Sequence, residues 1–170
     1  MPRRDLDQHF EDDRPEWTSR KHAVLSRYIV PGAMKISALD RERRVHLVDG
    51  YAGPNEYGGQ VMGSTAIMIN AAQTAAAQGR RVTVHACEVD TSRFASLQRN
   101  LASHLESGLL RVYNKTHAEA VPEIKHAAGN APAIIFLDPQ TAAQMTLEGD
   151  LRPRVDSKLK PTERHSLTQN

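Results

Sequence analysis

Residues 45–53 read Val-His-Leu-Val-Asp-Gly-Tyr-Ala-Gly, a largely apolar run that ends at an acid and opens a glycine-rich loop. A short run of this kind, stopped by Asp and Gly, is typical of a buried strand. The loop reaches residue 63 and contains five glycines and one proline, and the alanine-rich residues 66–78 then favour a helix with Ser64 as its cap. Strand, glycine loop and helix in this order predict the first unit of a parallel α/β sheet.

Further strands follow at intervals of about 25–35 residues, the spacing of strand–helix–strand units. The apolar runs that we interpret as strands are residues 81–87, 109–113 and 133–137. Helical patterns over residues 91–105 and 119–128 join them, so the connections are crossover helices rather than hairpins. The predicted fold class is therefore α/β, a doubly wound parallel sheet of about four strands.

Upstream of the first strand, the sequence predicts a helix that begins behind Asp13 and ends near Val30, at Pro31-Gly32. A short second helix is predicted over residues 33–39. The apolar stripe of the first helix, which we interpret as a packing face, is formed by Trp17, Lys21, Val24, Leu25 and Tyr28.

The 170 residues are enough for one domain with a core of its own. We interpret residues 1–14 as a mobile N-terminal arm, residues 15–149 as the folded domain and residues 150–170 as a disordered, mildly basic tail. Neither a signal peptide nor a long apolar span is visible, so we expect a cytoplasmic protein. The net charge of +2 is too small to indicate a nucleic-acid partner.

Several kinds of chemistry are excluded or disfavoured. The single Cys87 rules out an internal disulfide and is expected to be a small buried side chain. The eight histidines are scattered without a metal-ligand spacing, so no metal site is predicted. Ser64 lacks the Gly-x-Ser-x-Gly turn of a hydrolase nucleophile.

Glycines and acids follow the predicted strands at their carboxyl ends, where open parallel sheets bind ligands. Glycine lets the backbone approach a ligand closely, and an acid at the end of the second strand accepts hydrogen bonds from the two hydroxyls of a ribose. We therefore predict a nucleoside-binding site. Its candidate cofactor-binding residues are Asp49, Gly50, Tyr51, Ala52, Gly53, Glu88 and Asp90, and Asp138 and Pro139, at the end of the fourth strand, face the same site; their catalytic role is what the family resemblance below implies.

The loop after the first strand favours a ligand without phosphate at this point. It has no Gly-Lys-Ser/Thr and no Gly-x-Gly-x-x-Gly, the patterns that hold phosphates in nucleotide-binding folds. Asp49 stands in front of Gly50 and Gly53, and an acid there repels phosphate but attracts a cation. A nucleoside ligand with an amino group and a sulfonium charge fits this description, and S-adenosylmethionine is such a ligand.

A family resemblance points the same way. The helix Trp17-Thr18-Ser19-Arg20-Lys21-His22-Ala23-Val24-Leu25-Ser26-Arg27-Tyr28, the loop Val48-Asp49-Gly50-Tyr51-Ala52-Gly53-Pro54, and the pieces Glu88-Val89-Asp90 and Phe136-Leu137-Asp138-Pro139 together resemble the three-Cys-motif partner proteins (TcmP). These proteins look like class I methyltransferases with a Rossmann-like fold. The resemblance implies S-adenosylmethionine as cofactor, with Asp49, Gly50 and Gly53 around its methionine end and Glu88 on its ribose. It places Asp138-Pro139 at the transfer site and implies a three-Cys-motif protein as partner.

The chain also departs from the family pattern. Asn55 stands where members have a second glycine, Lys115-Thr116 where they have Gly-Asp, and Gln140-Thr141 where they have Phe-Gly. The family sheet has seven strands, so the resemblance implies a C-terminally truncated domain, inactive alone if its other half is needed. The alternative that we keep open is a non-catalytic interaction partner whose Rossmann-like half is completed by another protein chain.

Each predicted site residue also has a structural interpretation. Gly50 and Gly53 fit a tight turn, and Glu88 fits a solvated strand end. Asp90 fits the cap of the helix that follows it. Asp138-Pro139 fits a strand stop. Nucleic acid remains open as the target of a methyl transfer, and the methyl acceptor is not defined by these residues.

Overall fold

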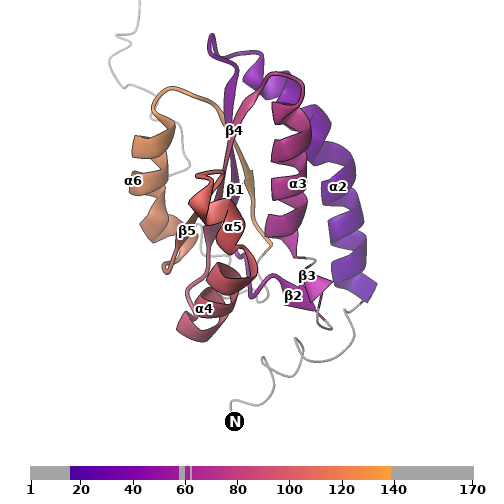
Figure 1. Ribbon diagram of the computed structural model, residues 1–170, viewed down its shortest axis with the longest axis vertical. Helices are drawn as coiled ribbons and strands as arrows, with labels where there is room; N and C mark the ends of the chain where they lie inside the picture. Colours follow the sequence, from indigo (N-terminus) through magenta and orange to yellow (C-terminus); the bar gives the residue numbers. More distant parts are fainter. Residues whose placement is uncertain (1–15, 58–59, 62, 139–170) are drawn as a thin grey trace, which may run out of the picture. The chain divides into compact units, whose positions relative to one another are not determined.

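The computed structural model describes residues 16–57, 60–61 and 63–138 of the chain. The helices and strands, labelled as in Figure 1, are α2 (Glu16–Ser37), β1 (Arg44–Asp49), β2 (Glu56–Tyr57), β3 (Gln60–Val61), α3 (Ser64–Ala76), β4 (Arg81–Cys87), α4 (Thr91–Asn100), α5 (Ala102–Glu106), β5 (Leu110–Tyr113), α6 (His117–Ala128) and β6 (Ala133–Phe136). The predicted boundaries of an arm, a domain and a tail fall outside the described residues.

The main sheet has four parallel strands in the order β5-β4-β1-β6. Leu47 of β1 is paired with Val84 on one side and with Ile134 on the other. The chain runs outward from β1 through β4 to β5 and then returns to the opposite side of β1 as β6. This reversal is the topological switch of a doubly wound sheet. The predicted fold class, an α/β Rossmann-like parallel sheet, is confirmed.

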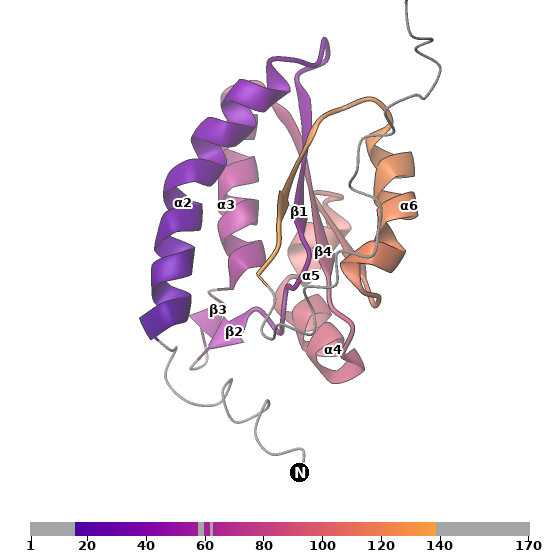
Figure 2. The same cartoon turned by 180° about the vertical axis from the view of Figure 1, so that it is seen from behind.

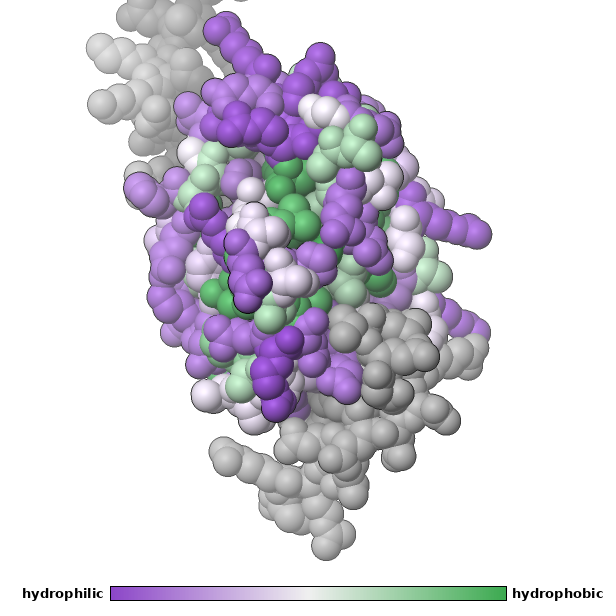
Figure 3. All heavy atoms as spheres, in the orientation of Figure 1, coloured by the Kyte–Doolittle hydropathy of each residue, from purple (hydrophilic) through white to green (hydrophobic). Residues whose placement is uncertain are grey.

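Helices cover both faces of the sheet (Figures 1 and 2). One face packs against α2, α3 and α4 through a core that includes Leu47, Val84, Met68 and Leu97. The other face packs against α6 through a smaller cluster of Val48, Cys87, Ala120 and Ile124. The alternation of Leu47 and Val48 between the two faces follows from the two-residue period of a strand. Figure 3 shows hydrophilic side chains over most of the visible face, with hydrophobic residues showing between them.

A row of polar rings, two of them buried and the third half-buried, crosses the α6 face of the sheet. The Nδ1 atom of His46 lies 2.8 Å from Nε2 of His85, and Nδ1 of His85 lies 2.9 Å from the hydroxyl of Tyr113. Burial lowers the pKa of His85 to about 3, with smaller effects from His46 and Arg111. Tyr113 also lines a hollow of about 510 Å³ between β5 and α6. We call the three side chains the His–His–Tyr row.

The helix before β1 differs from the prediction. It runs unbroken through Pro31 to Ser37, instead of ending near Val30 and restarting at 33. Pro31 is exposed, so the carbonyl of Arg27, which loses its usual partner, faces water. Gly32 brings the helix close to β6, since a Cβ there would lie 3.2 Å from Cδ1 of Ile134.

The predicted packing face of this helix is only partly correct. Leu25 is buried, but the side chains of Val24 and Tyr28 are 58% and 71% exposed. The side chain of Trp17 lies outside the described part of the structure. Val24 and Tyr28 therefore form an outward surface of α2 rather than part of the core.

Three smaller differences concern loops and helix ends. The predicted helix over 91–105 is divided at Leu101, whose φ of −121° interrupts the helical backbone between α4 and α5. The short hairpin of β2 and β3 was not predicted. Ser64 is the first residue of α3 rather than its cap; the cap is Gly63, which makes no side-chain hydrogen bond. None of the helices in the described ranges combines the length and apolar character that a membrane span requires.

Candidate functional site

The carboxyl ends of β1, β4 and β6 meet at one edge of the sheet, beside the switch between β1 and β6 (Figure 1). The predicted residues Asp49, Gly50, Gly53, Glu88 and Asp138 all lie at these strand ends or in the loop after β1. Main-chain hydrogen bonds extend the sheet into this region, for example from Gly50 N to Phe136 O at 3.0 Å. The topology therefore brings together residues that are far apart in the sequence.

Asp49 is fully buried and is held at the N-terminus of α3. Its Oδ2 atom accepts hydrogen bonds from the hydroxyls of Ser64 at 2.6 Å and Thr65 at 2.8 Å, and its Oδ1 atom accepts one from the main-chain nitrogen of Tyr51 at 3.3 Å. Burial raises the pKa of Asp49, these hydrogen bonds oppose the rise, and the negative charge of Asp138 adds to it. A carboxylate thus occupies the place where nucleotide-binding folds put a phosphate.

Glu88 ties the end of β4 to the loop after β1. Its Oε2 atom accepts a hydrogen bond of 2.9 Å from Gly53 N, and its Oε1 atom accepts one of 2.8 Å from Asp90 N. The side chain is buried, in contrast to the solvated strand end that we kept as the alternative. A carboxylate has about four acceptor positions, so Glu88 keeps acceptor capacity after these two bonds.

Asp90 turns away from this cluster toward the start of α4. Its Oδ1 atom accepts hydrogen bonds from the main-chain nitrogens of Ser92 and Arg93, both at 2.9 Å, and from the Ser92 hydroxyl at 2.6 Å. These bonds lower its pKa, the hydroxyl of Ser92 having the largest effect. Asp90 therefore caps α4, the second of the two roles considered for it.

Gly50 is at a close approach between the first loop and two other elements. A Cβ atom at Gly50 would lie 2.5 Å from Cδ2 of Leu137 and 3.3 Å from Cβ of His117. Next to it, the rings of Tyr51 and His117 have centroids 5.5 Å apart. His117 was not predicted as a site residue, and its place at the start of α6 depends on the tertiary fold. The loop continues with the buried Ala52, whose nitrogen donates to Cys87 O at 3.0 Å.

Asp138 forms an ion pair with Lys21 across the gap between β6 and α2. Both side chains are about one quarter exposed, at 26% and 24% respectively. The sequence pattern placed Lys21 on a packing face, so this contact was missed. The one available signal was a lysine within an otherwise apolar stripe. Pro139, the other predicted catalytic residue, lies outside the described residues.

The backbone at Asn55 explains how an asparagine can stand where the TcmP pattern has a glycine. Its φ of 58° is in the left-handed region, where glycine is favoured and asparagine is the next most tolerant residue. Its Oδ1 atom accepts a hydrogen bond of 3.2 Å from Ala66 N, so it serves the free N-terminus of α3. Its Nδ2 atom is buried and has no partner within the described residues.

The described residues contain no cluster of three or more His, Cys, Asp or Glu side chains arranged to hold a metal ion. Cys87 is buried, and burial together with the charges of Asp49 and Glu88 raises the pKa of its thiol to about 12. The thiol is therefore protonated at neutral pH, and its environment does not activate it as a nucleophile.

Comparison with known proteins finds a distant structural match but no family. No family model matches the chain, and no curated protein matches it. One matching solved structure is described as "Putative methyltransferase yhhF from Escherichia coli", with 19% identity and a TM-score of 0.34. The match covers 64% of this chain and 47% of that chain, so this chain spans about half the length of the matched one. The fold assignment rests on the strand order and register of this chain itself.

Proposed function

We propose that this chain is a methyltransferase-like domain of the three-Cys-motif partner type that binds S-adenosylmethionine. The observation that carries the proposal is the position of Asp49, a buried acid at the N-terminus of α3, beside Glu88 at the end of the neighbouring strand. This pair of acids disfavours phosphate where dinucleotides need it and favours a nucleoside with a cationic substituent.

The neighbouring residues support the same ligand. Glu88 has acceptor positions left for the two hydroxyls of a ribose. Gly50 and Gly53 keep the loop after β1 free of side chains at these two positions, although Leu137 and His117 already fill the space next to the Gly50 Cα. The φ of 63° at Gly53 lets the loop turn so that its nitrogen points to Glu88. Tyr51 with His117 supplies an aromatic surface next to this loop.

When bound, S-adenosylmethionine supplies a methyl group on a positively charged sulfur. Its transfer would need an acceptor amine in line with the carbon–sulfur bond, and water to take the proton that the amine gives up. Asp138 would accept a hydrogen bond from that amine and orient it. Lys21 would hold the carboxylate of Asp138 in place.

A thermal melt with and without S-adenosylmethionine tests the proposal. Ligand at about 100 times its dissociation constant adds about 2.7 kcal/mol of stability, which corresponds to a rise in Tm of roughly 5–10 °C for a domain of this size. NAD⁺ at equal concentration is the matched control, because it has the same adenosine but carries a pyrophosphate. If the protein melts cooperatively and neither compound raises its Tm, the assignment of S-adenosylmethionine as cofactor is wrong.

A second candidate function is that of a non-catalytic partner protein, completed by another chain such as a three-Cys-motif protein. The observation that favours it is the outer edge of β6, which no other described strand pairs with and where Ile135 is 44% exposed. An unpaired apolar edge is a site for strand addition. Light scattering after size exclusion, at rising concentration, separates the two functions. A stable monomer whose melt shifts with S-adenosylmethionine contradicts the partner function.

A further inference from the structure

Positive charge is concentrated in one segment of the chain. Residues 17–39 contain Arg20, Lys21, Arg27 and Lys35 and no acid, whereas the whole chain has a net charge of +2, which leaves −2 for all other residues. The small net charge therefore conceals a strong separation of charge along the sequence. Positive and negative residues are mixed along most of the chain, but not in this segment.

The structure places three of these four cations on the outward side of α2, whereas Lys21 is paired with Asp138. Arg20, Arg27 and Lys35 are exposed, and their spacing of seven and eight residues puts them along one side of the helix. Tyr28, 71% exposed, and Val24, 58% exposed, lie on the same side of α2. An exposed aromatic ring thus lies among arginines, on a helix whose opposite side packs into the core.

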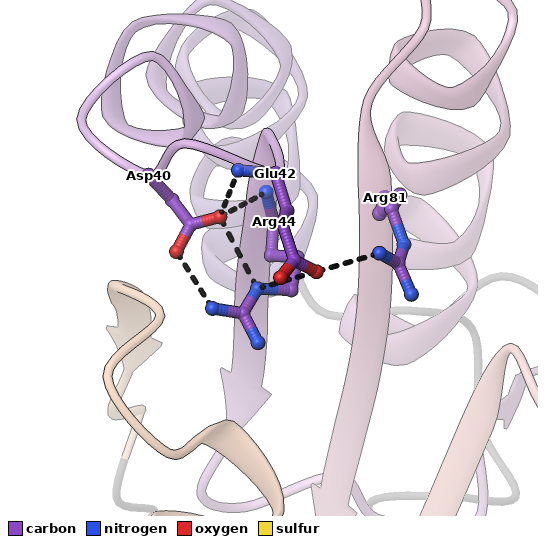
Figure 4. A network of polar contacts seen from close by, with 4 residues as sticks. All are labelled: Asp40, Glu42, Arg44 and Arg81. Carbon is purple, nitrogen blue, oxygen red and sulfur yellow. Dashed lines mark hydrogen bonds and ion pairs between the residues drawn. The ribbon is translucent and has the colours of Figure 1, made fainter.

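The basic surface continues into the turns beside the end of α2. Asp40 and Glu42 are the acids there, and Figure 4 shows both of them bound, Asp40 by Arg44 at 2.9 Å and Glu42 by Arg81 at 2.7 Å. The remaining cations of these turns are the exposed Arg41 and Arg43 and the half-buried Arg80, and the ion pairs found among the described residues include none of the three. A hydrogen bond of 3.0 Å from Arg81 N to Arg43 O joins the two turns.

We call Arg27, Tyr28, Lys35, Arg41, Arg43 and Arg80 the basic strip. It runs along α2 from the turns at the amino ends of β1 and β4 toward the end where Lys21 meets Asp138. On α2 the basic strip spans residues 27–35, about 12 Å of helix, and its other three members lie in the turns.

We propose that the basic strip binds the sugar–phosphate backbone of nucleic acid and leads it to Asp138, so that the methyl acceptor is a nucleobase. The binding surface stands on charge and exposure alone; the choice of acceptor rests on the proposed function. Spaced, exposed arginines contact successive phosphates, which fixes position without reading sequence. Tyr28 offers a face on which an unpaired base stacks.

The alternative occupant of such a surface is an acidic protein segment. The basic strip favours nucleic acid because its cations extend from the middle of α2 into the turns beside its end, and because an exposed tyrosine, Tyr28, lies next to Arg27. An acidic peptide gains from the charges but has no bases to stack on Tyr28. Binding of polyglutamate is therefore the competing outcome that the experiment has to separate.

The experiment is a fluorescence-anisotropy titration of the full chain with a labelled short single-stranded RNA and with a duplex of equal length. It is repeated between about 50 and 200 mM salt. The variant Arg27→Gln/Arg41→Gln should weaken binding of both probes and reduce the salt slope by about one for each lost phosphate contact. Tyr28→Ala should weaken single-strand binding at least about fivefold and leave duplex binding nearly unchanged.

Lys125→Gln is the matched control, because Lys125 is exposed on α6, which covers the other face of the sheet. Unchanged affinity in this control with weakened binding in the strip variants supports the proposal. Equal weakening in the control, an unchanged salt slope in the double variant, or polyglutamate binding as tight as RNA binding overturns it. The melt with S-adenosylmethionine is measured on the same variants, so failure of the strip and failure of the cofactor site are distinguished.

Discussion

Glu88 Oε2 accepts a hydrogen bond of 2.9 Å from the main-chain nitrogen of Gly53, so the acid that ends β4 holds the loop that follows β1. The same side chain also accepts a hydrogen bond from Asp90 N. A residue proposed to bind the ribose is therefore also part of the framework. Removing it alters the protein even when no ligand is present.

Glu88→Ala is expected to lower the free energy of unfolding by about 1–3 kcal/mol, because it leaves the buried main-chain nitrogen of Gly53 without an acceptor. Glu88→Gln should lower it less, since one oxygen remains. Urea denaturation measures both, with Glu106→Gln on the surface of α5 as control. If the stability of Glu88→Ala equals that of the parent protein, the prediction is wrong and the side chain of Glu88 matters only for binding the ligand.

Gly63→Ala is expected to destabilise the protein by about 1–3 kcal/mol through overpacking. An added Cβ at this position would lie 2.0 Å from Oδ1 of Asn55. Asn55→Gly removes that atom and suits the φ of 58°, so the double variant should recover part of the loss. A double-mutant cycle by urea denaturation measures this coupling. Additive effects of the two substitutions would contradict the contact.

The stability of the protein should fall as the pH drops from 6.5 toward 3, because burial lowers the pKa of His85 from 6.5 to about 3. As the pH falls, His85 takes up a proton in the unfolded chain before it does so in the folded protein. The neutral His85 therefore contributes its full stabilisation above pH 6.5, and this stabilisation is lost as the pH falls toward the folded-state pKa. This loss of stability is on the order of 5 kcal/mol at most.

His85→Gln keeps a hydrogen-bonding side chain but does not titrate in this range. Its stability should therefore depend less on pH between 6.5 and 3, and His126→Gln, an exposed change on α6, should follow the parent. Urea denaturation at several pH values makes the comparison. Parallel curves for the parent and His85→Gln would show that another group causes the acid sensitivity.

Asp49 should have the opposite effect on the pH dependence. Burial raises its pKa above the ordinary 3.8, so the folded protein holds this proton to higher pH than the unfolded chain does. Its stabilising contribution is full below about pH 3.8 and is lost as the pH rises through the folded-state pKa. Asp49→Asn does not titrate, and its stability relative to the parent should rise across that range. A difference independent of pH would contradict the raised pKa.

Much of the fold could be predicted because its signals are local. The apolar runs around Leu47, Val84 and Ile134 are strands, and the glycine loop between β1 and α3 is where it was expected. The unbroken α2 could not be predicted, since whether Pro31 ends a helix depends on whether the freed carbonyl faces solvent. That is decided by which side of α2 packs on the sheet.

The residues of the candidate site also fall into two groups, those that a local sequence signal places and those that only the tertiary fold places. Asp49, Glu88 and Asp138 follow strands, so the rule for parallel sheets places them at one edge. Lys21 and His117 come from helices, and their arrival at that edge depends on tertiary packing. The cap formed by Asn55 was hidden too, because it acts on Ala66 across the loop rather than on its own neighbours.

The His–His–Tyr row couples positions on three strands through its protons. With both imidazoles neutral, each of the two contacts holds a single hydrogen. The Tyr113 hydroxyl then points either toward His85 or out toward the hollow beside α6, and each choice fixes the tautomers of His85 and His46. The three side chains thus form a line of dipoles that reverses only as a whole. Hydrogen bonding of Tyr113 on the edge strand β5 therefore determines which ring nitrogen of His46, on the central strand β1, carries a proton.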